Sequence, residues 1–272
     1  MFKSIRKSFL LNFYIKLIKL LTNVRNSSIL YVGGNNLIET DRYKLYQGDC
    51  LKVMDRMIEE GIKVDLILTD PPYELENHGK GQNDFKDRKL IKENHIKDIS
   101  EGFNYEETFS RMLKLQNKIN ILIFCSNKQI SKIMSYFEQN EIKKKLSVTL
   151  LVWNKSNPIP LCRGKYISDA EFIIYVRGKG ATFNNEADIS KKYKVKKYPT
   201  VNAKKRLHKA QKPVELLMDL IELHSIENQV VFDPFMGSGS TGEGCLRLNR
   251  KFIGVENVKE HFNNAKERLE TL

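Results

Sequence analysis

Residues 232–242 read FDPFMGSGSTG, a glycine-rich turn between an expected strand at 230–232 and a helix. Such a turn presents backbone N–H groups and the amino end of a helix to an anion, and its glycines let a ligand approach the backbone closely. The spacing G-x-G-x-x-G occurs within it, and Glu256 follows about 20 residues later at the end of the next expected strand, where a carboxylate can bind ribose hydroxyls. The stretch predicts an anionic, nucleotide-like ligand, and taken alone it leaves a dinucleotide site open.

The position of this turn near the end of the chain indicates an unusual strand order. Only one expected helix follows Glu256, so the strands that complete the sheet must come from earlier in the sequence, which disfavours a dehydrogenase of ordinary topology. An expected strand at 43–46 ends shortly before Asp49, and an apolar strand at 64–69 runs directly into Asp70. Ligands bind at the carboxyl ends of strands in open α/β sheets. We therefore predict a circularly permuted α/β domain with an open twisted sheet.

The domain itself is predicted over residues 41–272, and three segments are expected to lie outside its sheet. Residues 1–40 contain an apolar stretch that lysines interrupt, which predicts an amphipathic extension and neither a membrane span nor a secretory signal. Residues 74–104 are polar and charged, as expected of a mobile loop. Residues 179–207 lack periodicity and are rich in lysine, and we interpret them as a small target-recognition insertion. A plain solvated surface is the alternative for that segment.

The composition indicates a polyanionic partner. The chain of 272 residues has a formal net charge of +13, which says little about the fold but favours nucleic acid as the partner. Its four cysteines lie far apart and form no C-x-x-C pair, so we expect no structural metal and a reducing, cytoplasmic location.

The sequence at residues 70–73, DPPY, follows the expected strand at 64–69, and its two prolines prevent that strand from continuing. Together with FMGSG at 235–239, it resembles the N6-adenine/N4-cytosine DNA methyltransferases of permuted, β-group-like motif order. In that family a D/S-P-P-Y/F/W motif precedes an F-x-G-x-G motif. The resemblance spans about residues 43–269 and also covers QGDC at 47–50, VWNK at 152–155 and HKAQKP at 208–213. Lys209 and Ala210 stand where relatives often have Pro-Thr, which puts a side-chain hydroxyl role there in doubt.

The resemblance implies a Rossmann-like methyltransferase fold and S-adenosylmethionine as the cofactor. The backbone of the glycine-rich turn would surround the methionine moiety, Glu256 would hold the ribose hydroxyls, and Asp49 with Cys50 would face the adenine. The methionine end would be closed by Lys212 and Pro213. The remaining residues that the resemblance assigns to the cofactor are Asp233, Pro234, Phe235, Gly237, Ser238, Gly239, Ser240 and Thr241.

Residues of the DPPY motif suit methyl transfer to an exocyclic amine. The lone pair of such an amine is delocalised into the base, and the Asp70 carboxylate and the Pro71 carbonyl could accept its hydrogen bonds and aim it at the methyl group. Pro71 and Pro72 restrict the backbone that carries these acceptors. Tyr73 could stack on a base that has been rotated out of the duplex. By resemblance, Asp before Pro-Pro-Tyr favours adenine over cytosine.

Double-stranded DNA is the expected substrate. Phosphate contacts are assigned to basic residues of the 179–207 segment, namely Lys191, Lys192, Lys196, Lys197, Lys204, Lys205 and Arg206. The open alternatives are an N4-cytosine DNA methyltransferase, an RNA methyltransferase with the same site, and a nucleic-acid-binding protein without activity. A homodimer and a cognate restriction endonuclease are also open as partners.

Overall fold

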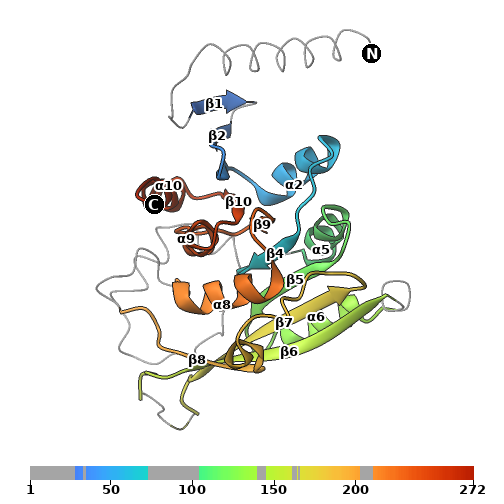
Figure 1. Ribbon diagram of the computed structural model, residues 1–272, viewed down its shortest axis with the longest axis vertical. Coiled ribbons are helices and arrows are strands. Elements are labelled where there is room, and N and C mark those ends of the chain that lie inside the picture. Colours follow the sequence, from blue (N-terminus) through green and yellow to red (C-terminus); the bar gives the residue numbers. More distant parts are fainter. Residues whose placement is uncertain are drawn as a thin grey trace.

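The computed structural model describes residues 28–32, 35–72, 104–139, 145–160, 164, 166–202 and 211–272. A mixed sheet of ten strands runs through them in the order β1-β2-β3-β10-β9-β4-β5-β7-β6-β8 (Figure 1). The strands are β1 (Ser28–Val32), β2 (Asn35–Glu39), β3 (Tyr43–Gln47), β4 (Leu66–Thr69), β5 (Asn120–Cys125), β6 (Leu146–Lys155), β7 (Ala170–Gly178), β8 (Val195–Tyr198), β9 (Val230–Asp233) and β10 (Lys251–Glu256). The helices are α2 (Cys50–Glu59), α5 (Tyr105–Lys114), α6 (Ile130–Phe137), α8 (Val214–His224), α9 (Ser240–Arg247) and α10 (Lys259–Glu270), with a short 3₁₀ helix η1 (Ile189–Lys192).

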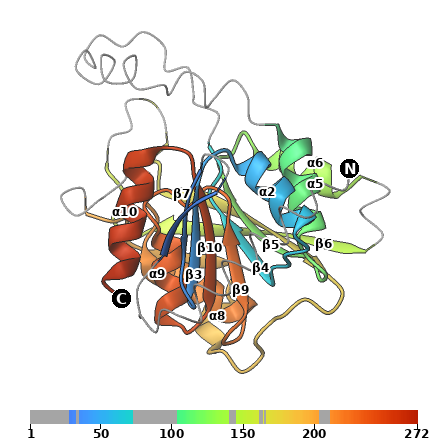
Figure 2. The ribbon, with the colours of Figure 1, turned by 90° about the horizontal axis from the view of Figure 1, so that it is seen from above.

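Helices cover both faces of the sheet. Alternate residues of β4 point to opposite faces, so Leu66 and Leu68 pack with α8, α9 and α10, whereas Ile67 packs with α2, α5 and α6. The two groups of helices lie on either side of the strands in Figure 2. Every residue of β4 and β5 is buried, as expected for parallel strands covered on both faces. The open α/β sheet predicted from the sequence is therefore confirmed.

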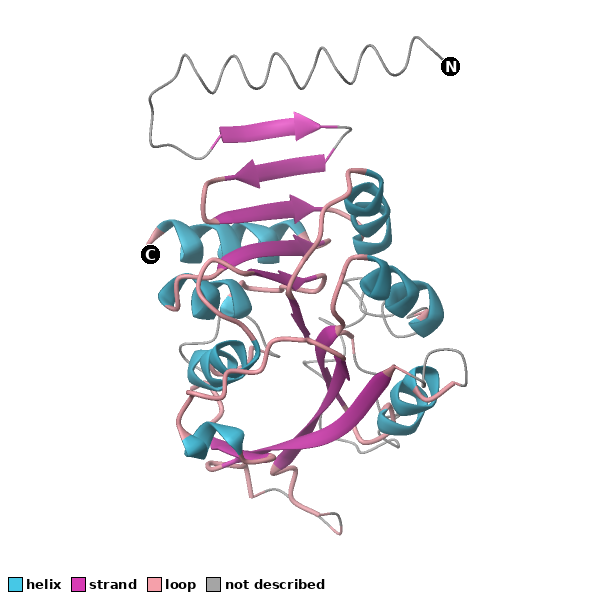
Figure 3. Ribbon diagram, turned by 45° about the vertical axis from the view of Figure 1, so that its right-hand side comes forward, coloured by secondary structure: helices cyan, strands magenta, loops and turns pink. Residues whose placement is uncertain are grey.

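The two strands nearest the end of the chain lie in the middle of the sheet. Strand β10 pairs in parallel with β3 and β9, and β9 pairs in parallel with β4. Figure 3 shows the strands following one another through the length of the molecule. The carboxyl ends of these strands therefore share one edge, which we call the active-site edge. It carries Asp49 after β3, Asp70 after β4, Asp233 at the end of β9 and Glu256 at the end of β10.

The direction of β7 decides where the segments around it lie. Strand β7 is antiparallel to both β5 and β6, so it begins at the active-site edge, where Phe172 pairs with Cys125. It ends at the opposite edge, where Arg177 pairs with Asn120. The chain after Gly178 therefore starts at the edge opposite the expected active site, and β8, which is parallel to β6, returns toward the active-site edge.

The structure contains elements that the sequence analysis did not predict. Within the expected extension over 1–40, residues 1–27 lie outside the described residues, but β1 and β2 join the sheet through β3, and Leu37 and Ile38 are buried. Helix α5 begins directly after Asn104, whose side chain accepts a hydrogen bond from the backbone N–H of Glu107. Strand β8 lies inside the segment 179–207 that was expected to lack periodic structure. Of the helices described here, none is both long and apolar enough to cross a membrane.

Candidate active site

Asp233 fixes the start of the glycine-rich turn. Its buried carboxylate accepts hydrogen bonds from the hydroxyls of Thr69 (2.8 Å) and Thr241 (2.7 Å) and from the backbone N–H of Phe235 (3.1 Å). Burial raises its pKa to about 7, although these hydrogen bonds act in the opposite direction. Because Thr69 immediately precedes Asp70, the same carboxylate also ties the glycine-rich turn to the end of β4.

The glycine-rich turn is open at Gly237 and closed at Gly239. Both have positive φ values, +51° and +79°, which favour glycine. A Cβ atom on Gly237 would meet nothing within 4 Å, whereas one on Gly239 would lie 3.0 Å from the Cβ of Ala265 in α10. Gly239 is therefore required for helix packing as well as for the turn, and Gly237 marks the side from which a ligand can approach the backbone.

Glu256 lies against this open side. Its carboxylate accepts hydrogen bonds from the backbone N–H groups of Gly237 (3.0 Å) and Val258 (2.8 Å), and burial raises its pKa. The backbone carbonyl of Glu256 accepts a hydrogen bond from the N–H of Gly48 (2.9 Å), which places the start of α2 beside it. There the Asp49 side chain caps α2 by accepting a hydrogen bond from the N–H of Lys52 (3.0 Å). The residues predicted for ribose and adenine thus lie at the carboxyl ends of neighbouring strands.

Several of the other predicted cofactor residues point into the protein. Ser240 and Thr241 are buried; the Ser240 hydroxyl accepts a hydrogen bond from Arg268 (2.7 Å), and Thr241 is held by Asp233. Pro234 and Ser238 are buried and Phe235 is half-buried. Cys50 is half-buried, and burial raises the pKa of its thiol to about 12. Backbone groups of the turn are therefore better placed than these side chains to bind a ligand.

The half-buried Asp70 forms an ion pair with the buried Lys212. The ammonium group of Lys212 lies 2.5 Å from Asp70 Oδ2 and 3.2 Å from Glu171 Oε2, and it sits 5.1 Å from the centre of the Phe124 ring. Burial alone would lower the pKa of Lys212, but the two carboxylates outweigh it and raise that pKa. Lys212, predicted from the resemblance to close the methionine end of the cofactor, is thus bonded to the expected catalytic carboxylate. Pro213 follows it, is buried and precedes α8.

The backbone after Asp70 is held by a residue that the sequence analysis missed. The fully buried Gln129 donates hydrogen bonds from Nε2 to the carbonyl of Pro72 (3.2 Å) and to the hydroxyl of Tyr105 (3.1 Å). Its Oε1 accepts a hydrogen bond from the N–H of Ser126 (3.0 Å). A single glutamine at the start of a helix carries no recognisable signal of this role in the sequence. Tyr73 and the predicted loop at 74–104, except for Asn104, lie outside the described residues.

The structure contradicts the assignment of Lys196 to phosphate contacts. Its side chain is only 4% exposed, its ammonium donates a hydrogen bond to the backbone carbonyl of Lys191, and burial lowers its pKa. In β8 the side chain of Val195 faces solvent and Lys196 faces inward, the reverse of what hydrophobicity predicts. Lys191 is also engaged, because its ammonium lies 2.6 Å from Glu222 in α8.

Of the other predicted phosphate contacts, Lys192 donates a hydrogen bond to the backbone carbonyl of Asn185 (2.6 Å), and Lys197 is exposed. Lys204, Lys205 and Arg206 lie outside the described residues. In the part of the chain that the structure covers, no group of three or more His, Cys, Asp and Glu side chains is placed to hold a metal ion.

A family model for DNA methylases of the N6/N4 type matches residues 64–267. The chain belongs to the N6/N4 DNA methylase family. This methylase is 29% identical over 248 residues to the Type II methyltransferase M2.LlaDCHI of Lactococcus lactis subsp. cremoris, across 85% of this chain and 90% of that protein. It is 28% identical over 244 residues to the Type II methyltransferase M2.MboI of Moraxella bovis, across 83% of this chain and 87% of that protein.

Solved structures agree with this assignment. The structure of M1.HpyAVI in complex with SAM superposes on this methylase with a TM-score of 0.64 at 30% identity, across 84% of this chain and 100% of that one. The cytosine-N4-specific PvuII DNA methyltransferase shares the fold, with a TM-score of 0.61 at 16% identity, across 84% of this chain and 86% of that one. The predicted family and the methyltransferase fold are confirmed.

S-adenosylmethionine is the cofactor of this methylase. The residues present fit that molecule, because the open backbone at Gly237, the half-buried Glu256 and the exposed Asp49 form a row along the carboxyl ends of β9, β10 and β3. When bound, the cofactor supplies a methyl group that its sulfonium centre has already activated.

Proposed function

We propose that this methylase transfers a methyl group from S-adenosylmethionine to the exocyclic N6 amine of adenine in double-stranded DNA. One observation carries the proposal. The end of β4, with Asp70, and the glycine-rich turn are joined by the hydrogen bond from Thr69 to Asp233, so a group held by Asp70 would lie beside the proposed methionine site. No covalent intermediate is required, because the methyl group is already activated.

The residues around Asp70 provide positioning and hydrogen-bond acceptors. The Asp70 carboxylate and the Pro71 carbonyl accept hydrogen bonds from the amine, which localises the nitrogen lone pair and directs it in line toward the methyl group. Gln129 fixes the carbonyl of Pro72, so the backbone that carries these acceptors has little freedom. The base must leave the duplex to reach them, and Tyr73 would stack on it.

Adenine is favoured over cytosine because Asp precedes Pro-Pro-Tyr in this chain. The fold does not discriminate between the two bases, since a cytosine-N4-specific enzyme shares it. N4-cytosine methylation is the second candidate. Both curated relatives are named Type II methyltransferases. We therefore also propose that a cognate restriction endonuclease accompanies this methylase and that both act in the cytoplasm.

Transfer of a labelled methyl group from the cofactor tests the choice of substrate. Unmethylated genomic DNA, total RNA and a protein extract would be offered separately to the wild-type enzyme, and we expect incorporation into DNA alone. Incorporation into RNA at a comparable or higher rate would replace the proposal with an RNA methyltransferase, and no incorporation into any of them would refute the enzymatic assignment.

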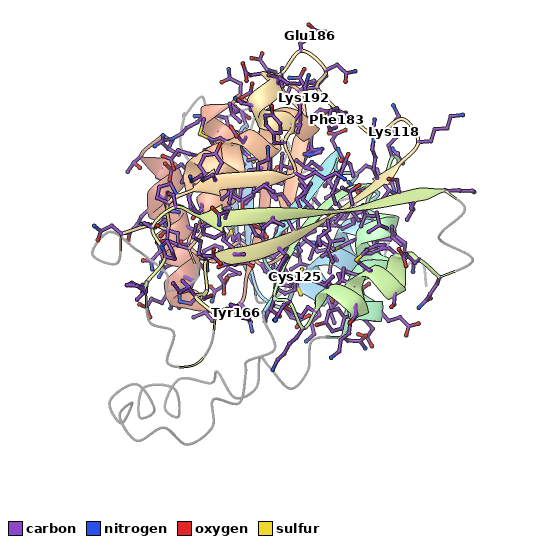
Figure 4. The ribbon with its side chains drawn as sticks, turned by 90° about the horizontal axis from the view of Figure 1, so that it is seen from below. Lys118, Cys125, Tyr166, Phe183, Glu186 and Lys192 are labelled. Carbon is purple, nitrogen blue, oxygen red and sulfur yellow. The ribbon has the colours of Figure 1, made fainter. Side chains whose placement is uncertain are left out.

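We propose that DNA binds at the active-site edge, over the described residues between β6 and β7, which are 156–160, 164 and 166–169. The amide oxygen of Asn157 accepts hydrogen bonds from the N–H (2.6 Å) and hydroxyl (3.1 Å) of Thr200, so this connection and the chain after β8 form one surface. Tyr166 is fully exposed there. Figure 4 shows Tyr166 on the same side of the molecule as Cys125, with Glu186 and Lys192 on the opposite side.

Two exposed tyrosines provide a matched test of this DNA-binding surface. Tyr166→Ala is expected to weaken binding to duplex DNA by roughly tenfold, because the tyrosine hydroxyl can donate a hydrogen bond to a phosphate and a hydrogen bond to a charged group is worth about 1.5–3 kcal/mol. Tyr193→Ala, which removes another exposed tyrosine next to Lys192, should leave the dissociation constant unchanged. Neither variant should alter the steep dependence of affinity on salt, which reports the neutralisation of phosphates by lysine and arginine. Weaker binding in Tyr193→Ala alone would contradict this proposal and would indicate that DNA binds at the opposite edge of the sheet.

A further inference from the structure

A row of four side chains with alternating charge leads inward to Asp70. Lys155 Nζ lies 3.0 Å from Glu171 Oε1, Glu171 Oε2 lies 3.2 Å from Lys212 Nζ, and Lys212 Nζ lies 2.5 Å from Asp70 Oδ2. The side chains of Lys155, Glu171 and Lys212 are 13%, 21% and 7% exposed. At these exposures each charge depends on its neighbours for compensation, because water reaches it poorly.

The two members of this row farthest from Asp70, Glu171 and Lys155, lie on strands of the sheet. Glu171 is the second residue of β7 and pairs with Trp153 of β6, and Lys155 ends β6 two residues further on. The Lys155 ammonium also lies 5.5 Å from the centre of the Trp153 ring. Lys212, in contrast, directly precedes Pro213 and α8, so its long side chain depends on contacts for its position. Glu171 is the contact that comes from the sheet.

We propose that Glu171 is a positioning residue for methyl transfer, which holds the Lys212 ammonium in place against Asp70 so that the carboxylate keeps one orientation toward the incoming amine. This inference rests on the proposed function, in which Asp70 binds that amine. Glu171 itself acts through Lys212. Together with Asp70, it also balances the positive charge of the buried Lys212 ammonium.

The charged groups around Lys212 determine how the loss of Glu171 should change the pH dependence of activity. Asp70 faces it from the end of β4 and Glu171 from β7, with Lys155 of β6 behind Glu171. Cys125 of β5 stays a neutral thiol, since burial and these two carboxylates raise its pKa to about 12. Burial lowers the pKa of Lys212, and only the two carboxylates raise it. Loss of Glu171 therefore shifts that pKa downward, and activity that needs the ammonium is lost as the pH rises through the new value.

The test compares Glu171→Gln with Glu222→Gln, which makes the same change at another lysine-paired glutamate at the far end of α8. Glu171→Gln is expected to lower kcat by roughly 10- to 100-fold, as loss of a supporting partner does at other sites. As the pH rises, this variant should also lose activity at a lower pH than the wild type does. Cofactor affinity should change less than about threefold, Glu171→Asp should recover part of kcat, and Glu222→Gln should match the wild type.

A second measurement does not depend on catalysis. With lysine labelled at Cε, the NMR titration of Lys212 should move to lower pH in Glu171→Gln and stay unchanged in Glu222→Gln. An unmoved titration, or a Glu171→Gln enzyme with wild-type kcat and pH profile, overturns the inference. A wild-type enzyme that methylates no DNA while the titration moves as expected refutes the proposed function and leaves the role of Glu171 in fixing Lys212 supported.

Discussion

Replacing Asp70 with alanine is expected to lower the rate of methyl transfer by at least ~10²-fold, which is the effect of deleting a preorganised hydrogen-bond partner from other active sites. The variant loses one of the two proposed acceptors for the amine, and Lys212 is left with Glu171 as its remaining carboxylate partner. Cofactor affinity should barely change, because Gly237, Glu256 and Asp49 lie at the carboxyl ends of other strands. Single-turnover kinetics and calorimetry with S-adenosylmethionine measure the two quantities separately.

Asp70→Asn separates the charge of this residue from its hydrogen-bonding capacity. The amide oxygen can still accept a hydrogen bond from the amine, so some activity should persist relative to alanine. The amide cannot pair with the buried Lys212 as a carboxylate does, so the rate should remain well below that of the wild type. If folded Asp70→Ala transferred methyl groups at the wild-type rate, the proposed mechanism would be wrong.

Gly237→Val is expected to weaken S-adenosylmethionine binding by at least ~10²-fold. The new side chain would enter the open space from which the ligand approaches the turn, and it would also strain a backbone with φ of +51°. That strain costs about 1–2 kcal/mol, which a domain of ordinary stability tolerates. Calorimetry on the folded variant provides the measurement.

The control for this variant is Gly61→Val. Gly61 has φ of +72°, and a Cβ atom there also meets nothing within 4 Å, but it follows α2 at the edge away from the cofactor. It should share the loss of stability and keep wild-type cofactor affinity. Gly239→Val is less informative, because its clash with Ala265 would disturb α10. Equal cofactor affinity in Gly237→Val and Gly61→Val would show that the turn does not bind the cofactor.

The strands that carry the motifs could be predicted because their sequences are mostly apolar and each is followed by an aspartate and a proline. The expected strand at 64–69 contains β4, and the expected strand at 230–232 lies within β9. Their meeting at one edge also followed from the sequence, since parallel strands place their carboxyl ends together. The circular permutation itself stays a prediction.

Other features depend on tertiary contacts that no local pattern records. Lys196 lies in a stretch of sequence that resembles an exposed basic run. It can nevertheless be buried, because its ammonium donates a hydrogen bond to a backbone carbonyl within the fold. Glu171 and Gln129 gain their roles from partners distant in sequence, Lys212 and Pro72. Strands β1 and β2 extend the sheet, although they belong to the segment 1–40, which the sequence analysis interpreted as an amphipathic extension from the lysine-interrupted apolar stretch that precedes them.

Mass analysis of nucleosides tests the central claim most directly. Unmethylated duplex DNA would be incubated with S-adenosylmethionine and either the wild-type enzyme or Asp70→Ala, digested to nucleosides and separated. The account predicts N6-methyladenine in the DNA treated with the wild type and at least ~10²-fold less with the variant. N4-methylcytosine as the product, or equal amounts of N6-methyladenine from both enzymes, would contradict it.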